Sequence, residues 1–413
     1  MKNKNKPARS KLCVLAQLCK HIPSHAVSKI ARDLNDEKKP RSFSAWSHVV
    51  SLLYAQLCHS ISLADVCDGL ALRHSRLSLL RNAIAPKRNT LSHANRTRDP
   101  ALMQKLFWET LDSLIKQTPR FGPSGRYVAV PRKFKRAIHA IDSSTISLVA
   151  NCLDWAKHRR RKAAAKLHLT LNLQTFLPTI AIIEEASHHD STRAGELCAP
   201  LKEGEIAVFD KAYVDFKHLS QLDERHVFWV TRAKENMSYV VVEEREVKES
   251  QGIIKDQLIE LNVEKSQNAY PKRLRMVVAR VEVDGKEIKM TFITNNLKWA
   301  ASSVAGLYKS RWGIEAFFKE IKQTLKLSGF IGYNKKAIQW QIWAALLVWL
   351  LTRYTKFICN WKHSFTRLMA LLRSHVWDLY DVAELLQFHG TAGGLPRLIA
   401  EPGQAYFDGF EPK

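Results

Sequence analysis

The sequence lacks any Cys-x-x-Cys pair, and its seven cysteines are scattered along 413 residues. An odd number of unclustered cysteines fits neither a disulfide framework nor a four-ligand zinc site. We therefore expect reduced, mostly buried thiols. Internal repeats and low-complexity segments are also missing, and 46% hydrophobic with 25% charged residues predicts ordinary globular modules.

The sequence also has no apolar run long enough to cross a membrane. The longest run, Ile342–Leu351, is about half of the roughly 20 residues that a transmembrane helix needs. The basic, polar start Met1–Lys11 is not followed by the apolar segment of a signal peptide. We therefore expect a cytoplasmic protein with no membrane partner, in which Ile342–Leu351 lies in a buried helix.

Acidic residues are few relative to basic ones: Asp and Glu number 39 against 64 Lys and Arg, a net charge of +25. Because so positive a globule repels itself unless a polyanion compensates, nucleic acid is the expected partner. The densest basic run is Trp155–Lys162, and we predict that it binds DNA phosphates in a salt-dependent way. Its predicted phosphate contacts are Arg159, Arg160, Arg161 and Lys162.

Residues 10–118 follow a helical period. Apolar residues recur from Trp46 to Leu57 behind a serine cap at Ser42 or Ser44, and two shorter helices follow, the second over 88–96. This order resembles a helix-turn-helix, in which the last helix enters a DNA major groove. A solvated basic helix on an ordinary bundle is the alternative. The side chains that the last helix would present are Asn89, Ser92, His93, Asn95, Arg96 and Arg98.

The period then changes to that of strands. Apolar runs over 137–141, 167–173 and 179–183 predict three meandering strands, and runs over 206–209 and 227–230 predict two parallel strands joined by a crossover helix. This is the strand order of ribonuclease H-like domains, so we predict an α/β fold with that core and a β-rich insertion. The predicted segments are a helical DNA-binding domain at 1–118, a linker at 119–136, the first part of the catalytic core at 137–237, the insertion at 238–293, the last strand and C-terminal helices of the core at 294–388, and an irregular tail at 389–413.

Two of these strands lead into an aspartate, Asp142 after Ile141 and Asp210 after Phe209. Strands that end at one edge of a sheet place such side chains side by side, where they could share a divalent metal ion. Taken singly, an aspartate after a strand is more often a turn former or a helix cap.

A later segment carries a polar stripe. On a helical wheel Tyr308, Arg311, Glu315 and Lys322 lie within roughly 60° of one another, apart from the apolar arc. Such a helix packs by one side while its stripe faces a site. The alternative is a solvated face with an i,i+4 ion pair between Arg311 and Glu315.

The stripe matches, spacing for spacing, the Y-(2)-R-(3)-E-(6)-K signature of bacterial insertion-sequence transposases of the DDE superfamily, in the group called insertion-sequence family four. The segments around Asp142 and Asp210 resemble the first two catalytic aspartates of that family, and residues 42–46, 55–57 and 90–95 are similar to its N-terminal DNA-binding module. The resemblance implies that Asp142, Asp210 and Glu315 are catalytic and hold two Mg²⁺ ions, for which Mn²⁺ can substitute. The phosphate contacts that it implies are Tyr308, Arg311 and Lys322.

The implied activity is DNA cleavage at the ends of a mobile element and strand transfer into target DNA, by a cut-and-paste route that in related enzymes passes through a hairpin. The implied partners are terminal inverted repeats, target DNA and a second copy of the chain, on the bacterial nucleoid. A catalytically inactive protein that still binds terminal repeats is one alternative, and a nuclease that does not join is another. Trp229 and Tyr239 could stack on a flipped base, although core packing is the more common role, and His188–Asp190 is expected to be a polar loop near the site.

Overall fold

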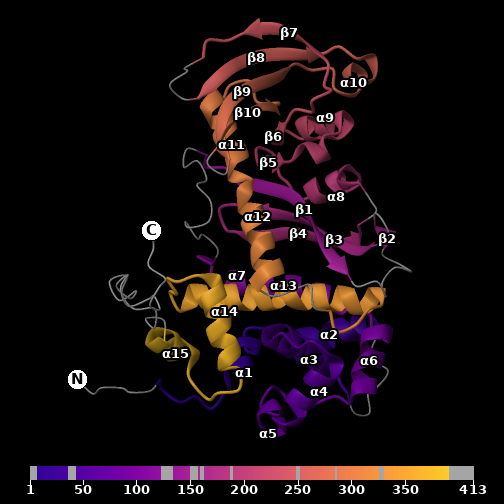
Figure 1. The fold of residues 1–413 in the computed structure, drawn as a ribbon, viewed down its shortest axis with the longest axis vertical. Coiled ribbons are helices and arrows are strands. Elements are labelled where there is room, and N and C mark those ends of the chain that lie inside the picture. Colours follow the sequence, from indigo (N-terminus) through magenta and orange to yellow (C-terminus); the bar gives the residue numbers. More distant parts are fainter. Residues whose placement is uncertain are drawn as a thin grey trace, which may run out of the picture. The chain divides into compact units, whose positions relative to one another are not determined.

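The computed structural model describes residues 7–35, 43–121, 134–148, 157–158, 162–186, 189–247, 252–283, 286–324 and 330–389. They fall into two compact units, a helical unit from residues 1–121 and 320–413 and an α/β unit from residues 122–319 (Figure 1). The sequence predicted that all helices after residue 294 belong to the catalytic core. From Glu320 onward, however, the chain packs with the N-terminal helices.

The helical unit is built around α13 (Lys335–Ile358), against which α3 (Ala45–Cys58) and α7 (Ala101–Gln117) pack. The apolar run Ile342–Leu351 is buried within α13, which confirms the predicted buried helix. The side chain of Asn334 accepts the Ala337 N–H and so caps the start of α13. The other elements of this unit are α1 (Val14–Cys19), α2 (Ala26–Asp33), α4 (Leu63–Ala71), α5 (His74–Leu77), α6 (Arg88–Thr97), the π turn η6 (Glu320–Thr324), α14 (Phe365–Ser374) and α15 (Val382–His389).

None of the described helices is by itself long and apolar enough to cross a membrane. Only α3 and α4 taken together reach that length and composition, and they are bent by 105°.

Three N-terminal helices confirm the sequence-based prediction. Ser44 caps α3, and Ser62 forms a capping box with Asp65 at the start of α4. The third predicted helix is α6, although the short helix α5, which was not predicted, separates it from α4.

Two side chains of the predicted groove-facing set are structural. Asn95 on α6 is 2% exposed and its Oδ1 lies 2.8 Å from His48 Nε2, so it is not available to a base. Arg98 donates to the backbone carbonyl oxygens of Phe43 and Ser44. The prediction was wrong for Asn95 because helical periodicity does not reveal which polar residue a neighbouring helix covers.

The α/β unit contains a mixed sheet with the order β2-β3-β1-β5-β6-β10-β9-β8-β7, and β4 pairs with β3. Strands β1, β3 and β4 form an antiparallel meander, and β5 and β6 run parallel to β1, as predicted. The strands are β1 (Ile138–Leu148), β2 (Lys157–His158), β3 (Lys162–Asn172), β4 (Leu177–Glu185), β5 (Ile206–Phe209), β6 (Phe228–Arg232), β7 (Tyr239–Glu244), β8 (Ile253–Leu261), β9 (Leu274–Val283) and β10 (Lys286–Thr294).

The β-rich insertion continues the core sheet. Its last strand, β10, pairs antiparallel with β6, with Phe292 opposite Arg232. Strand β8 and helix α10 (Glu264–Ala269) lie in a stretch where no element was predicted. The described residues after Thr294 contain no regular strand, so the strand expected in 294–388 is instead β10, which belongs to the insertion.

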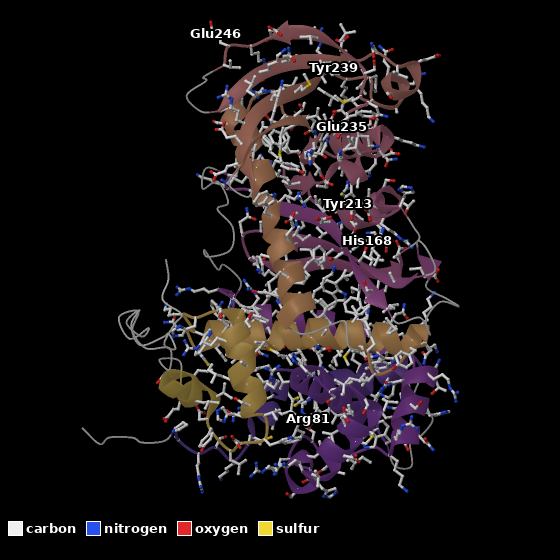
Figure 2. The ribbon with its side chains drawn as sticks, in the orientation of Figure 1. Arg81, His168, Tyr213, Glu235, Tyr239 and Glu246 are labelled. Atoms are coloured by element: carbon white, nitrogen blue, oxygen red, sulfur yellow. The ribbon has the colours of Figure 1, made fainter. Side chains whose placement is uncertain are left out.

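Helices cover both faces of the sheet. On one face α8 (Ala194–Cys198) and α9 (Phe216–Glu224) pack over a core that includes Ile141, Phe209 and Trp229. On the other face lie α11 (Ala301–Ser310) and α12 (Trp312–Lys319) (Figure 1). Trp229 is fully buried, and Tyr239 packs partly buried against the same core (Figure 2), so the core-packing interpretation is confirmed for both.

Candidate active site

The parallel pairing of β1 with β5 brings the two predicted aspartates to the same level of the sheet. Ile141 lies opposite Phe209, and the next residues are Asp142 and Asp210. Strand β1 does not end at Asp142 but runs on to Leu148, whereas Asp210 leaves the sheet and begins the short helix η4 (Lys211–Tyr213). Asp142 Oδ1 accepts the Ser143 N–H at 2.8 Å.

The helix that was predicted as continuous is interrupted at Arg311, between α11 and α12. There the Arg311 N–H donates to the Tyr308 carbonyl at 3.0 Å, a tighter i to i−3 bond. Tyr308 at the end of α11 and Glu315 in the first turn of α12 therefore lie on either side of the Arg311 side chain.

Three contacts join this turn to the aspartates. Tyr308 Oη donates to Asp210 Oδ1 at 3.1 Å. Arg311 Nη1 donates to Asp142 Oδ2 at 2.8 Å, and Arg311 Nη2 donates to Glu315 Oε1 at 2.7 Å. The i,i+4 pair of the alternative interpretation thus exists, but the same guanidinium also binds Asp142. Five predicted residues come together here.

The site is mostly buried. Tyr308 is 3% exposed and Arg311 8%, whereas the Glu315 side chain is 53% exposed. Burial raises the pKa of Asp142 to about 6; Asp210 and Glu315 act in the same direction, and Arg311 and the Ser143 N–H oppose them. Burial also raises the pKa of Tyr308 to about 12, so this hydroxyl keeps its proton and can donate.

The raised pKa of Asp142 predicts a pH dependence of stability. The folded pKa is about 6, against about 4 in an unfolded chain, so between these values the metal-free folded state binds more protons than the unfolded state. Stability should therefore fall by roughly 1–3 kcal/mol as the pH rises from about 4 to about 6. Urea unfolding in EDTA over this pH range gives the stability of wild type and of Asp142→Asn, which cannot titrate at this position. The difference in stability between the two proteins should change with pH. A difference that does not vary with pH contradicts the prediction.

The donor set fits a divalent metal ion. Asp142, Asp210 and Glu315 offer carboxylate oxygens, the ligands that hard cations take. The Arg311 guanidinium bridges two of these carboxylates, so a positive charge is already stabilised between them. Within the part of the chain that the structure describes, no three His, Cys, Asp or Glu side chains are gathered to hold a metal ion.

The other predicted residues belong to other elements of the chain. Lys322 lies in η6 of the helical unit, where burial lowers its pKa. Asn89, His93 and Arg96 are exposed on α6. In the basic run, the backbone of Lys162 begins β3, and residues 159–161 lie outside the described part of the chain.

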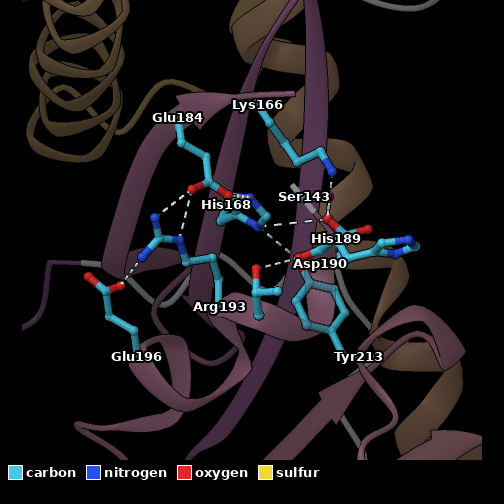
Figure 3. Close-up of polar contacts among 10 residues, drawn as sticks. Ser143, Lys166, His168, Glu184, His189, Asp190, Arg193, Glu196 and Tyr213 are labelled. Atoms are coloured by element: carbon cyan, nitrogen blue, oxygen red, sulfur yellow. Dashed lines mark hydrogen bonds and ion pairs between the residues drawn. The ribbon is translucent and has the colours of Figure 1, made fainter. Parts of the chain in front are cut away.

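Sequence reasoning missed a buried polar network beside this site (Figure 3). The alternation in β3 predicted the strand but not the environment of its polar residues, and both His168 and Thr170 are fully buried. Asp190 was expected in a polar loop near the site. Its Oδ1 accepts a hydrogen bond at 2.8 Å from the hydroxyl of Ser143, the residue next to Asp142. His189 is exposed and His188 lies outside the described residues. The sequence did contain one indication of this network, because His168 interrupts the apolar residues of an alternating strand.

A family model described as "Transposase DDE domain" matches residues 133–351, more than half of the chain. The chain belongs to this family. The transposase is therefore a DNA-binding enzyme that cleaves DNA and transfers strands, and its catalytic domain is of a metal-dependent class. A second model, a domain of unknown function (DUF4372), matches residues 10–80.

Two proteins of similar sequence agree with this assignment. The chain is 31% identical to a protein of Sinorhizobium fredii named as transposase y4zB, over 65% of this chain and 72% of that one. It is 22% identical to the transposase for insertion sequence element IS231E of Bacillus thuringiensis, over 89% and 86% of the two chains. A cryo-EM structure of the piggyBac transposase synaptic complex with hairpin DNA is similar at a TM-score of 0.47 and 11% identity, covering 95% of this chain and 85% of that one.

Proposed function

We propose that Asp142, Asp210 and Glu315 are the catalytic carboxylates of the transposase and hold two Mg²⁺ ions, for which Mn²⁺ can substitute. One observation carries the proposal: Asp142 of β1, Asp210 just after β5 and Glu315 of α12, far apart in sequence, are joined by hydrogen bonds from Tyr308 and Arg311. Bound metal would activate water or a 3′-hydroxyl and neutralise charge on the leaving oxygen.

The residues around the carboxylates have complementary roles in this proposal. With a divalent cation held by Asp142, Asp210 and Glu315, the Arg311 guanidinium would no longer be needed to balance these carboxylates and could bind a DNA phosphate in bidentate fashion. Tyr308 remains a proton donor and can bind a phosphate oxygen. Lys322, in the helical unit, is proposed as a further phosphate contact.

We also propose a ribonuclease H-like core and membership of insertion-sequence family four, with its Y-R-E-K signature. The meander of β1, β3 and β4, followed by β5 and β6 parallel to β1, supports that core. The likeness to an insertion-sequence transposase over most of the chain supports the family. The 238–293 segment would then be an insertion that lengthens the core sheet.

The N-terminal helices are proposed to bind the terminal inverted repeats, with Asn89, His93 and Arg96 of α6 facing DNA and the basic run at 159–162 contacting phosphates. The exposure of these α6 side chains supports the proposal. Because each phosphate contact contributes to the salt dependence of binding, Arg96→Ala should weaken end binding and lower the salt slope by about 1. Fluorescence anisotropy over a salt series measures both the DNA affinity and its salt dependence. Arg32→Ala, at an exposed position on α2, is the control and should change neither. An unchanged slope would remove Arg96 from the interface.

Strand transfer distinguishes the proposed transposase from a nuclease of similar fold and from an inactive repeat-binding protein. The test needs a donor end with a free 3′-hydroxyl, taken from the short inverted repeats that we expect in the DNA that flanks the coding region. The purified chain, as a homodimer on paired ends, should join this donor to plasmid DNA in Mg²⁺ or Mn²⁺. Cleavage without joined product favours the nuclease, and binding without cleavage favours the inactive protein.

A further inference from the structure

Behind the carboxylates, on the opposite face of the sheet, lies a polar network that the catalytic proposal does not use (Figure 3). We call it the Asp190 network. His168 and Tyr213 in it are almost fully buried, and the Glu184 side chain is 9% exposed. Its members are Ser143, Lys166, His168, Glu184, Asp190, Arg193 and Tyr213.

The strand register places this network directly behind the first carboxylate. Ser143 lies opposite His168 in the β1–β3 pair. Successive side chains of a strand point to opposite faces, so Asp142 faces Arg311 while Ser143 faces Asp190. Ser143 is the link between the two faces, since its backbone N–H donates to Asp142 Oδ1 at 2.8 Å and its Oγ donates to Asp190 Oδ1 at 2.8 Å.

Asp190 is itself held in place. Lys166 Nζ donates to the same Asp190 oxygen at 3.1 Å. Asp190 begins the short helix η3 (Asp190–Arg193), and Arg193 at its end binds Glu184 Oε2 through Nε at 2.8 Å and Nη2 at 2.6 Å. Lys166 of β3 binds Asp190, and Arg193 of η3 binds Glu184 of β4, so η3 is held against both strands. The Asp190 oxygen that accepts the Ser143 hydroxyl therefore has little freedom to move.

The network also reaches the second aspartate. Glu184 Oε1 lies 2.9 Å from His168 Nε2, and His168 Nδ1 lies 3.3 Å from Tyr213 Oη. The Tyr213 N–H donates to the Asp210 carbonyl at 3.0 Å. His168 Nδ1 also lies 3.8 Å from Asp190 Oδ1, so one partly buried chain of contacts joins the backbone beside Asp142 to the backbone at Asp210.

We propose that Ser143 and Asp190 are positioning residues that set the orientation of Asp142 and, through the Asp190 network, its spacing from Asp210, so that both carboxylates can bind metal. This inference rests on the proposed metal-binding role of the aspartates. Neither Ser143 nor Asp190 needs to touch the metal, because they act through the Ser143 N–H and the strand backbone. Outer partners of this kind affect metal affinity by about 10–100-fold.

The test measures Mn²⁺ binding to the full chain by electron paramagnetic resonance, without DNA and well below the unfolding temperature. Ser143→Ala and Asp190→Asn should each weaken Mn²⁺ binding about 10–100-fold. Ser143→Thr keeps the hydroxyl and should restore affinity to near that of wild type. Two matched controls should leave affinity unchanged: Ser147→Ala, an exposed serine further along β1, and Glu196→Gln, a carboxylate that binds Arg193 at the rim of the network.

The outcomes separate this inference from the proposed function. If Asp142→Ala does not weaken Mn²⁺ binding, the metal assignment itself fails. If Asp142→Ala weakens binding but Ser143→Ala does not, only the positioning role fails, even where Asp190→Asn or Ser143→Ala lowers the unfolding temperature. Ser143→Ala removes a single hydroxyl, so it carries the test if Asp190→Asn does not fold.

Discussion

Asp142→Ala should lower metal-dependent cleavage and joining of the element end by at least about 10³-fold while DNA binding persists. A bound metal ion contributes several kcal/mol to transition-state stabilisation, and each 1.36 kcal/mol changes a rate tenfold. DNA affinity depends instead on basic side chains spread over the protein, which this substitution leaves in place. Single-turnover cleavage and strand transfer of a labelled end in Mg²⁺ and Mn²⁺ measure the loss, and fluorescence anisotropy measures binding.

Asp33→Ala, an exposed aspartate on α2, is the matched control and should cleave at the wild-type rate. Asp142→Asn keeps the shape of the side chain and removes its charge, so it should be nearly as inactive as Asp142→Ala. Cleavage by Asp142→Asn within tenfold of wild type would falsify the assignment of this carboxylate as a metal ligand.

Arg311→Ala should destabilise the metal-free protein by about 2–4 kcal/mol and lower cleavage by at least about 10²-fold. The substitution leaves Asp142 mostly buried without its cationic partner, beside two other carboxylates. The expected loss of folding free energy lies at the lower end of the range for breaking a buried ion pair, because the Glu315 side chain is 53% exposed. A divalent cation that occupies the same carboxylates should recover much of this stability, since ligand bound to the folded state alone stabilises it.

Arg275 provides the matched control for the metal effect. It is 3% exposed and donates to both oxygens of Asp256, at 2.8 Å and 2.6 Å, within the insertion. Arg275→Ala should also destabilise the protein, but Mg²⁺ should not reverse its effect. Urea unfolding in EDTA and in Mg²⁺ compares the two variants. Equal recovery of both, or recovery of neither, would show that Arg311 does not lie at the cation site.

The sequence by itself determined most local elements and several of the side chains that meet at the candidate site. A serine before an apolar helical period predicted α3, a short apolar run predicted β5, and Asp142 and Asp210 come after apolar residues of two strands that prove to be parallel neighbours. These predictions succeed because a cap, a period or a strand end depends on residues close together in the chain. The spacing of Tyr308, Arg311 and Glu315 likewise identified a helix face that does meet both aspartates.

Only the tertiary structure decided which of these faces are covered and by what. Periodicity marks His168 as polar-facing, but η3 and α8 bury that face and turn it into a network. It also marks the insertion as β-rich without showing that β10 pairs with β6. Arg311 binds Asp142 and Glu315 at once because distant strands and a helix turn meet there. Such contacts depend on which segments pack together, and no local pattern encodes that choice.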